Sequence, residues 1–251
     1  MKSRHNRRAV YILPNLFTTA NILAGFYSIL AAHAGRYITA AWVIMLAVLF
    51  DNLDGKVARL THTESQFGVE YDSLSDLISF GVAPAFLVYV FVLQDFGRLG
   101  IIASFLFVLT GALRLARFNV QTAHRESFIG LPIPGAASVV ASLVLICDYY
   151  GFNFQRYSVV FLVAIYLLAF LMISTLKYRS FKSASTTKRI SIRTFALIVL
   201  VFLLFAFKPY LFIPAATIGY AASGPVEYLF KTLKRIKGGV SHGEREEDIN
   251  L

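Results

Sequence analysis

Apolar residues fill most of the chain in long runs, and short polar segments separate one run from the next. A helix needs about 20 apolar residues to cross the roughly 30 Å of hydrocarbon in a bilayer, and several runs reach that length. The pattern therefore predicts an all-α fold, a polytopic membrane helix bundle of about eight transmembrane helices. The predicted spans are residues 15–33, 37–60, 70–93, 99–118, 133–150, 157–176, 194–207 and 209–230.

These spans form one predicted membrane domain over residues 1–231. Residues 232–251 are charged and contain glycine, which favours a disordered cytosolic tail. The division between the last two spans depends on Lys208-Pro209, which interrupts a continuous apolar stretch. A proline at that point makes either a turn or a kink.

Charge is distributed along the chain in a way that predicts its orientation. Hydrophobic residues make up 57% of the chain and charged residues only 15%, with a mean hydropathy of +0.64, which is too apolar for a soluble domain. All but four of the 24 Lys and Arg residues fall on one side of the predicted topology; the exceptions are Arg36, Arg98, Arg156 and Lys208. The positive-inside rule then places both termini in the cytosol. Topology accounts for the net charge of +10, and no nucleic-acid partner is expected.

Four aspartates interrupt the apolar pattern: Asp51, Asp54, Asp72 and Asp76. Ionisable groups at membrane depth are costly and indicate function. The second and third predicted helices run in opposite directions, so both pairs fall toward their cytosolic ends. At 100° per residue, Asp51 and Asp54 share a helix face with Gly55, and Asp72 and Asp76 form a stripe with Gly68 if the third helix extends that far. The two stripes can face each other across a cleft.

Four neighbouring carboxylates repel one another, so cations must offset them. Oxygen ligands suit Mg²⁺ or Mn²⁺, and two such ions would hold the phosphates of an in-line displacement. Arg59 can bind a phosphate bidentately, while Gly55 and Ala58 let a nucleotide approach the helix. Alternatively, the acids pair with Lys56 or Arg59 in a structural network, and Gly55 and Ala58 serve helix packing.

The acids and their neighbours resemble the signature of the CDP-alcohol phosphatidyltransferase family. Its positions here are Asp51, Asp54, Gly55, Ala58, Arg59, Gly68, Asp72 and Asp76. The resemblance implies a membrane enzyme, generally a homodimer, that uses CDP-diacylglycerol or CDP-archaeol and releases CMP. It also implies that the four aspartates bind metal, that Asp76 is the general base, and that Gly55, Ala58 and Arg59 bind the CDP moiety together with Asp54.

Three further segments resemble the phosphatidylserine synthase branch of that family: Leu13–Leu16 with Thr18, Asn21 and Gly25; Leu113–Asn119; and Phe128–Pro134. They imply L-serine as the acceptor. Arg114 and Arg117, spaced i and i+3, could bind its carboxylate or could be topogenic charges at the lipid headgroups. Asn21 could hydrogen-bond the nucleotide or a neighbouring helix. Glu70, one turn before the acidic pair, is a weaker candidate for the site.

Other functions stay open from the sequence. Glycerol 3-phosphate or inositol phosphate acceptors would call for additional basic residues. A cation transporter would place its acids near the bilayer midplane in broken helices. An intramembrane prenyltransferase would need a second acidic motif, and no comparable pair follows Asp76. We expect a site on the cytosolic side of the cytoplasmic membrane, in contact with membrane lipid.

Overall fold

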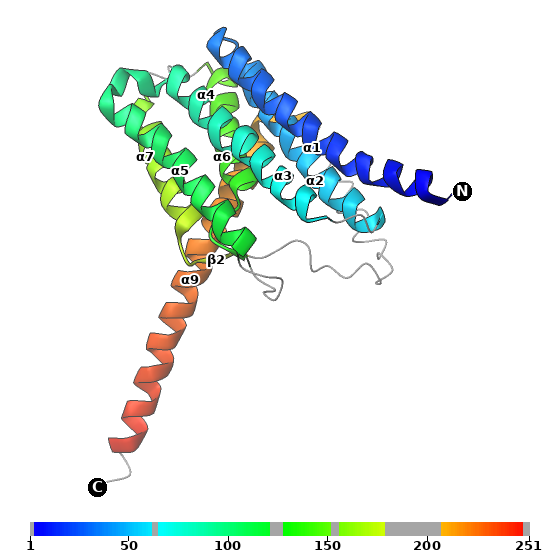
Figure 1. Cartoon of the computed structure of the whole chain (residues 1–251). Helices are drawn as coiled ribbons and strands as arrows, with labels where there is room; N and C mark the ends of the chain where they lie inside the picture. The colour runs from blue at the N-terminus through cyan, green and yellow to red at the C-terminus, as the bar shows by residue number, and fades with distance from the viewer. Residues whose placement is uncertain (1–2, 62–64, 121–127, 152–155, 179–206, 248–251) are drawn as a thin grey trace.

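Helices account for nearly all regular structure in the part of the chain that the computed structural model describes, residues 3–61, 65–120, 128–151, 156–178 and 207–247. Their order is α1 (Ser3–His33), α2 (Tyr37–Thr61), α3 (Gln66–Asp76), the π-helical turn η1 (Leu77–Val82), α4 (Ala83–Phe91), the 3₁₀ turn η2 (Leu93–Phe96), α5 (Arg98–Val120), α6 (Ile133–Tyr149), α7 (Ser158–Ile173) and α9 (Pro209–Glu247). Two short strands, β1 (Phe128–Ile129) and β2 (Lys177–Tyr178), pair antiparallel beside the bundle (Figure 1).

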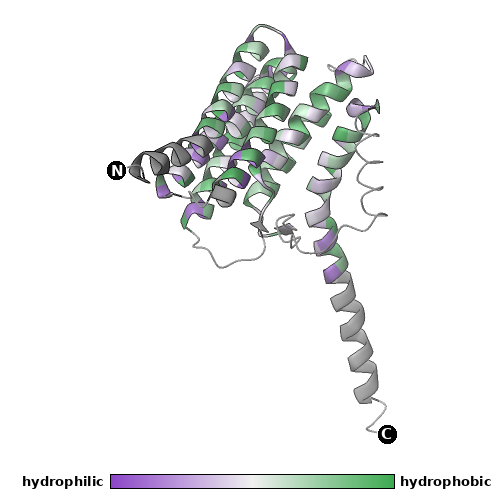
Figure 2. Cartoon of the chain, turned by 90° about the vertical axis from the view of Figure 1, so that its right-hand side faces the viewer, coloured by the Kyte–Doolittle hydropathy of each residue, from purple (hydrophilic) through white to green (hydrophobic). Residues whose placement is uncertain are grey.

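Four helical segments are long and apolar enough to cross a membrane: Asn15–His33, Tyr37–Val57, Gln66–Phe91 and Arg98–Val120. The helices α6 and α7 are apolar but shorter. Hydrophobic residues run along the bundle helices (Figure 2), and many large ones are exposed, among them Leu23, Phe105 and Phe170. An apolar exterior of this extent suits lipid and not water. The all-helical membrane bundle predicted from the sequence is therefore consistent with the structure.

The count of eight spans and the sides of the termini stay predictions. The predicted span 194–207 falls almost entirely outside the described residues, and only its last residue, Phe207, is described. After it, Lys208 is non-helical and α9 begins at Pro209. The helix break therefore lies at the Lys208-Pro209 step. Proline suits the start of a helix because its missing N–H would have had no intrahelical partner there.

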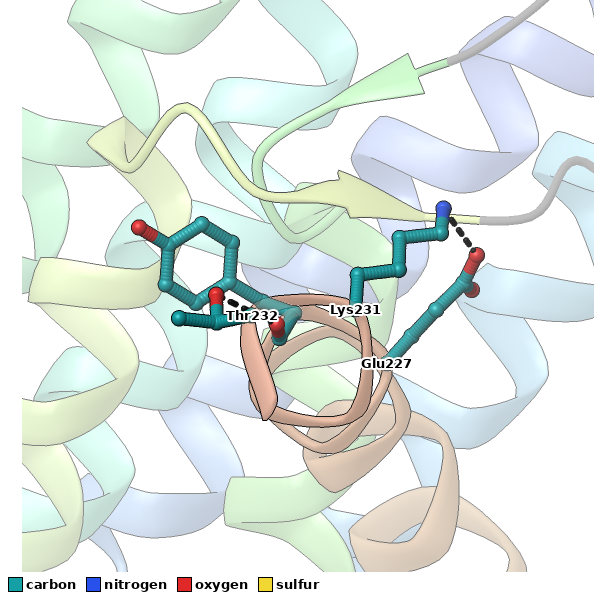
Figure 3. A network of polar contacts seen from close by, with 4 residues as sticks. Glu227, Lys231 and Thr232 are labelled. Atoms are coloured by element: carbon teal, nitrogen blue, oxygen red, sulfur yellow. Dashed lines mark hydrogen bonds and ion pairs between the residues drawn. The ribbon is translucent and has the colours of Figure 1, made fainter. Parts of the chain in front are cut away.

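The helix α9 leaves the bundle and projects beyond it (Figure 1). It continues past residue 232, where the sequence places the start of the tail, to Glu247. On its exposed surface Lys231 donates to Glu227 at 2.7 Å, one turn earlier (Figure 3). The boundary between membrane domain and tail stays a prediction.

The helix α6 occupies the middle of the bundle, in contact with α2, α4, α7 and α9. Pro132 occupies the position before its first residue and Pro134 lies in its first turn, where proline's missing N–H has no intrahelical partner to lose. The hydroxyls of Ser142 on α6 and Thr217 on α9 lie 3.0 Å apart, so a polar contact joins the two helices within an apolar setting. This contact helps to hold α9 against the bundle.

The segment α3–η1–α4 forms one continuous helical path that carries two of the four aspartates. Ser65 caps its beginning by accepting a hydrogen bond from the Gly68 N–H at 3.1 Å, so Gly68 lies within the helix as predicted. The π turn directly follows Asp76 and precedes Pro84 in the first turn of α4. Proline lacks an N–H and its ring clashes with the carbonyl four residues earlier. The wider π turn accommodates that clash without breaking the helix.

The helix α1 packs directly against this segment. A Cβ built on Gly25 would lie 2.7 Å from Ser79 Cα, so the two backbones approach more closely than any side chain allows. Ser75 and Ser79 donate their hydroxyls to the carbonyl oxygens of Thr18 and Asn21, at 3.2 and 2.8 Å. These contacts fix α1 relative to the aspartates of α3.

Candidate active site

Three aspartates from two helices meet at one point. Asp51 of α2 and Asp72 and Asp76 of α3 each place a carboxylate oxygen so that all three atoms lie within 4.8 Å of one another. Oxygens bound to one octahedral Mg²⁺ at about 2.1 Å lie about 3.0–4.2 Å apart, so three carboxylate oxygens this close can share an ion after a small rearrangement of their side chains. The two antiparallel acidic stripes predicted from the sequence therefore do converge.

The chemistry of this group fits a hard divalent cation. All three ligand atoms are carboxylate oxygens, the type that Mg²⁺ and Mn²⁺ prefer. Asp76 is buried, with 8% of its surface exposed, and Asp51 and Asp72 are half-buried. Acids that repel one another in such a place are stabilised by a cation.

Asp54 lies beside this group but outside the 4.8 Å set. It is 4% exposed and interacts electrostatically with Asp72 and Asp51. The hydroxyl of Thr18 on α1 donates to its Oδ2 at 3.2 Å. Asp54 is therefore a neighbour of the three-carboxylate group, and a hydrogen bond from α1 sets the orientation of its side chain.

Asn21 of α1 is fully buried and turns its side-chain amide toward Asp76. Its Nδ2 donates to Asp76 Oδ1 at 3.5 Å. Its Oδ1 is buried without a hydrogen-bond partner among the described residues. The structure thus favours a role in orienting Asp76, while the predicted contact with the nucleotide stays a prediction.

The predicted nucleotide contacts lie on the last turns of α2. Gly55 is exposed, and a Cβ built there would meet no described atom within 4 Å, so it does not serve close helix packing. The space beside it is open to a ligand. Ala58 and Arg59 continue the helical backbone, but their side chains lie outside the described structure, so their contacts stay predictions.

The two arginines of α5 differ in their surroundings. The Nε atom of Arg114 is buried without a hydrogen-bond partner in the described structure, and its guanidinium interacts electrostatically with Asp76. Arg117 is half-buried and makes no hydrogen bond or ion pair with a described residue. Position thus favours Arg114 as a component of the site and gives no such support to Arg117.

Two features escaped the sequence analysis. Asn119, at the end of α5, donates to Glu70 Oε2 at 3.0 Å and exchanges hydrogen bonds with Ser73, so the last turn of α5 is tied to α3. Glu70 is thus part of a link between helices. Tyr220 of α9 interacts electrostatically with Arg114, although the sequence assigns no role to the last two helices. Only tertiary packing brings Tyr220 there, and no spacing in the sequence indicates it.

The fold and the acidic group define a class of protein: an all-helical bundle with helices apolar and long enough to cross a membrane, and a cluster of carboxylate oxygens that fits a divalent cation. Comparison with known proteins makes this specific. Residues 11–173 match the model of the CDP-alcohol phosphatidyltransferase family. The chain belongs to this family, as the signature around the aspartates predicted, and it is therefore a phosphotransferase.

Several relatives resemble the chain over long stretches. A CDP-diacylglycerol–serine O-phosphatidyltransferase of Helicobacter pylori is 41% identical over 230 residues, which cover 90% of this chain and 95% of the relative. A protein of the same description from Methanocaldococcus jannaschii is 40% identical over 68% of this chain and 75% of its own. An archaetidylserine synthase of Methanothermobacter thermautotrophicus is 44% identical over 66% of this chain and 69% of its own.

Proposed function

We propose that this chain is a phosphatidylserine synthase, which transfers a phosphatidyl group from CDP-diacylglycerol to the hydroxyl of L-serine and releases CMP. The observation that carries the proposal is the meeting of Asp51, Asp72 and Asp76 within 4.8 Å in a chain of this family. The named activity of the Helicobacter pylori relative, which matches nearly end to end, supports serine as the acceptor. Family membership argues against the cation transporter and the prenyltransferase considered from the sequence.

Asp51, Asp54, Asp72 and Asp76 would hold two divalent ions, Mg²⁺ or Mn²⁺, with Asp54 completing the three-carboxylate group. Such ions neutralise the diphosphate and stabilise the charge that develops on the entering and leaving oxygens. Gly55, Ala58 and Arg59 would receive the CDP moiety along α2. The open space beside Gly55 supports this placement.

Asp76 would act as the general base. Its carboxylate removes the proton of the serine hydroxyl, whose oxygen then forms a bond to the phosphorus that bears the diacylglycerol. The bond between that phosphorus and the oxygen of CMP breaks, and CMP leaves with the electron pair. The proton passes from Asp76 to the leaving phosphate or to water. Asn21 supports this role because its amide holds one oxygen of Asp76, which leaves the other for the substrate.

The site would lie toward the cytosolic side of the cytoplasmic membrane, where CDP-activated lipid in the inner leaflet and soluble serine can both reach it. The charge asymmetry of the loops supports this orientation. By the family resemblance we also expect a homodimer embedded in membrane lipid.

The deciding experiment measures CMP release by the purified protein with CDP-diacylglycerol and a panel of acceptors. We expect turnover with L-serine and much less with glycerol 3-phosphate, inositol phosphate or inositol. A clear preference for one of these others contradicts the acceptor and leaves the family intact.

The donor is tested in the same assay. The archaetidylserine synthase relative makes CDP-archaeol the specific alternative to CDP-diacylglycerol. The two lipids differ in their hydrophobic chains and share the CDP headgroup, so the proposed role of the aspartates at the diphosphate is the same for both donors. A higher kcat/KM with CDP-archaeol would replace the donor in the proposal and keep the mechanism.

A further inference from the structure

Beside the candidate base, the Nε donor of one arginine has no hydrogen-bond partner among the described residues. This Nε, of Arg114, is buried and donates to no acceptor in the described part of the chain. A guanidinium stays charged in proteins, and a buried polar group without a partner is costly. Such a group points to a ligand with acceptor oxygens. The electrostatic interaction between Arg114 and Asp76 places that ligand next to the proposed base.

The packing of α9 brings Tyr220 to the same place. A Cβ built on Gly135, in the first turn of α6, would lie 3.3 Å from Tyr220 Cε1, so one edge of the ring packs against this glycine. One turn before Arg114, a Cβ on Gly111 would meet Ile133 at the start of the same helix α6 at 2.6 Å. The start of α6 therefore packs against α5 one turn before Arg114 and against α9 at Tyr220.

Tyr178 of β2 holds Tyr220 from the other side. Their ring centroids lie 5.8 Å apart, and the Tyr178 hydroxyl donates to the Ala221 carbonyl at 3.0 Å. Burial, with Tyr220 beside it, raises the pKa of Tyr178 to about 12, so this hydroxyl remains a donor at physiological pH. Gly224, one turn further on, lets α9 press against the Tyr178 ring. Tyr220 is thus held in place by surrounding packing and has little freedom to turn away.

We infer that Tyr220 is an acceptor-binding residue, and that its hydroxyl and the Arg114 guanidinium together bind the carboxylate of the amino-acid acceptor. The inference rests on the proposed function and adds the residue that selects for the carboxylate. A carboxylate has two oxygens, so one accepts from Arg114 Nε while the other accepts from the phenol. The acceptor hydroxyl then lies on the Asp76 side of Arg114, where the proton must be removed.

This assignment extends the site beyond the shared family region. The family match ends at residue 173, whereas Tyr220 lies on α9. The Helicobacter pylori relative matches over 90% of this chain, and the archaeal relatives over about two thirds. The acceptor site would therefore combine Arg114, which lies within the region matched by the family model, with Tyr220, which lies on a helix outside that region.

The test compares Tyr220→Phe with the wild type in CMP release, and it uses Tyr228→Phe as the matched control. Phenylalanine keeps the ring packing on Gly135 and Tyr178 and removes only the hydroxyl. Tyr228 lies two turns further along α9 and is 60% exposed. Loss of a hydrogen bond to a charged group predicts a KM for L-serine about tenfold higher in Tyr220→Phe. We expect kcat and the KM for the CDP-lipid to change less than twofold, and Tyr228→Phe to resemble the wild type.

Serinol separates carboxylate binding from a structural role, because it replaces the carboxylate of serine with a hydroxymethyl group. Its inhibition constant against L-serine, measured in the same preparations, should be the same in wild type and Tyr220→Phe. An equal loss for serine and serinol, or a parallel rise in the KM for the CDP-lipid, overturns the inference. This comparison remains valid if the variant is less stable, since both ligands are measured on the same folded fraction.

A double-mutant cycle with Arg114→Gln completes the test. If both groups bind one carboxylate, Tyr220→Phe should raise the KM for serine much less in the Arg114→Gln background than alone. Full additivity contradicts shared binding. A failure of the proposed function gives a different result, because the wild type would then prefer an acceptor other than serine. In that case the inference about Tyr220 fails together with the proposed function. A wild type that prefers serine, with an unchanged KM in Tyr220→Phe, refutes the inference alone.

Discussion

Replacing Gly25 by alanine tests the contact that fixes α1 against the acid-bearing helix. The added methyl carbon would lie 2.5 Å from Ser79 Oγ and 2.7 Å from Ser79 Cα, where unstrained carbons stay beyond about 3.4 Å. The serine hydroxyl can rotate, but the Cα cannot, so α1 and η1 must separate by about 0.7 Å. The rotation also removes the Ser79 hydrogen bond to the Asn21 carbonyl.

The cost follows from these two changes. Overpacking of this kind costs about 1–3 kcal/mol, and the lost hydrogen bond about 1 kcal/mol. Alanine regains up to about 1 kcal/mol over glycine through helix propensity. The net destabilisation is then about 1–3 kcal/mol. Because α1 also carries Thr18 and Asn21, which contact Asp54 and Asp76, a displacement of this size should lower turnover by roughly tenfold to a hundredfold.

Thermal unfolding in detergent and CMP release measure the two effects, with Gly219→Ala as the matched control. Gly219 is also helical, and a Cβ there would meet no described atom within 4 Å, so this variant keeps the propensity gain without the clash. We expect Gly25→Ala to unfold at a lower temperature than Gly219→Ala and to lose activity. Equal unfolding temperatures and full activity for the two variants would refute the close approach of α1 and η1.

Three further predictions concern the site. EDTA should abolish CMP release, and Mg²⁺ or Mn²⁺ should restore it, because clustered acids need a cation; full turnover in metal-free buffer contradicts the metal site. Asp76→Asn should lower turnover by about 10²–10⁴-fold with CDP-lipid binding weakened far less, whereas Asp51→Asn should weaken lipid and metal binding together, as measured by isothermal titration beside CMP release. Near-normal turnover in Asp76→Asn would show that it is not the base. Asn119→Ala should destabilise the protein by about 1 kcal/mol through loss of the link to Glu70, as measured by thermal unfolding. Asn52→Ala should not, because the Asn52 amide donates within its own helix, to the Val48 carbonyl.

The local parts of the site could be predicted from the sequence. Helical periodicity places Asp51 near Asp54 on one helix and Asp72 near Asp76 on another, and a short connection makes those helices antiparallel. Convergence of the two pairs then follows from geometry, and the structure confirms it for Asp51, Asp72 and Asp76. Asp54 lies beside that set, and its carboxylate accepts a hydrogen bond from Thr18 of α1.

The contacts made by distant helices could not be predicted. Thr18 and Asn21 reach the aspartates because Gly25 lets α1 approach η1, and no period in the sequence pairs these helices. Tyr220 reaches Arg114 through the packing of α9 on α6, which depends on small residues such as Gly135. A family signature also cannot show this, since it describes the shared region and ends before α9.

The π turn after Asp76 acts as a phase shift within a single helix. One extra residue in the turn rotates everything after it by about 100° relative to an uninterrupted α-helix. The acidic face of α3 and the apolar face of α4 therefore point in directions that differ from those of an uninterrupted helix, although the backbone runs continuously through both. A related chain that lacked the π turn would need one residue fewer between Asp76 and Pro84 to direct both faces as they are here. An insertion or deletion in this short stretch would therefore turn the aspartates away from their partners even if every aspartate were kept.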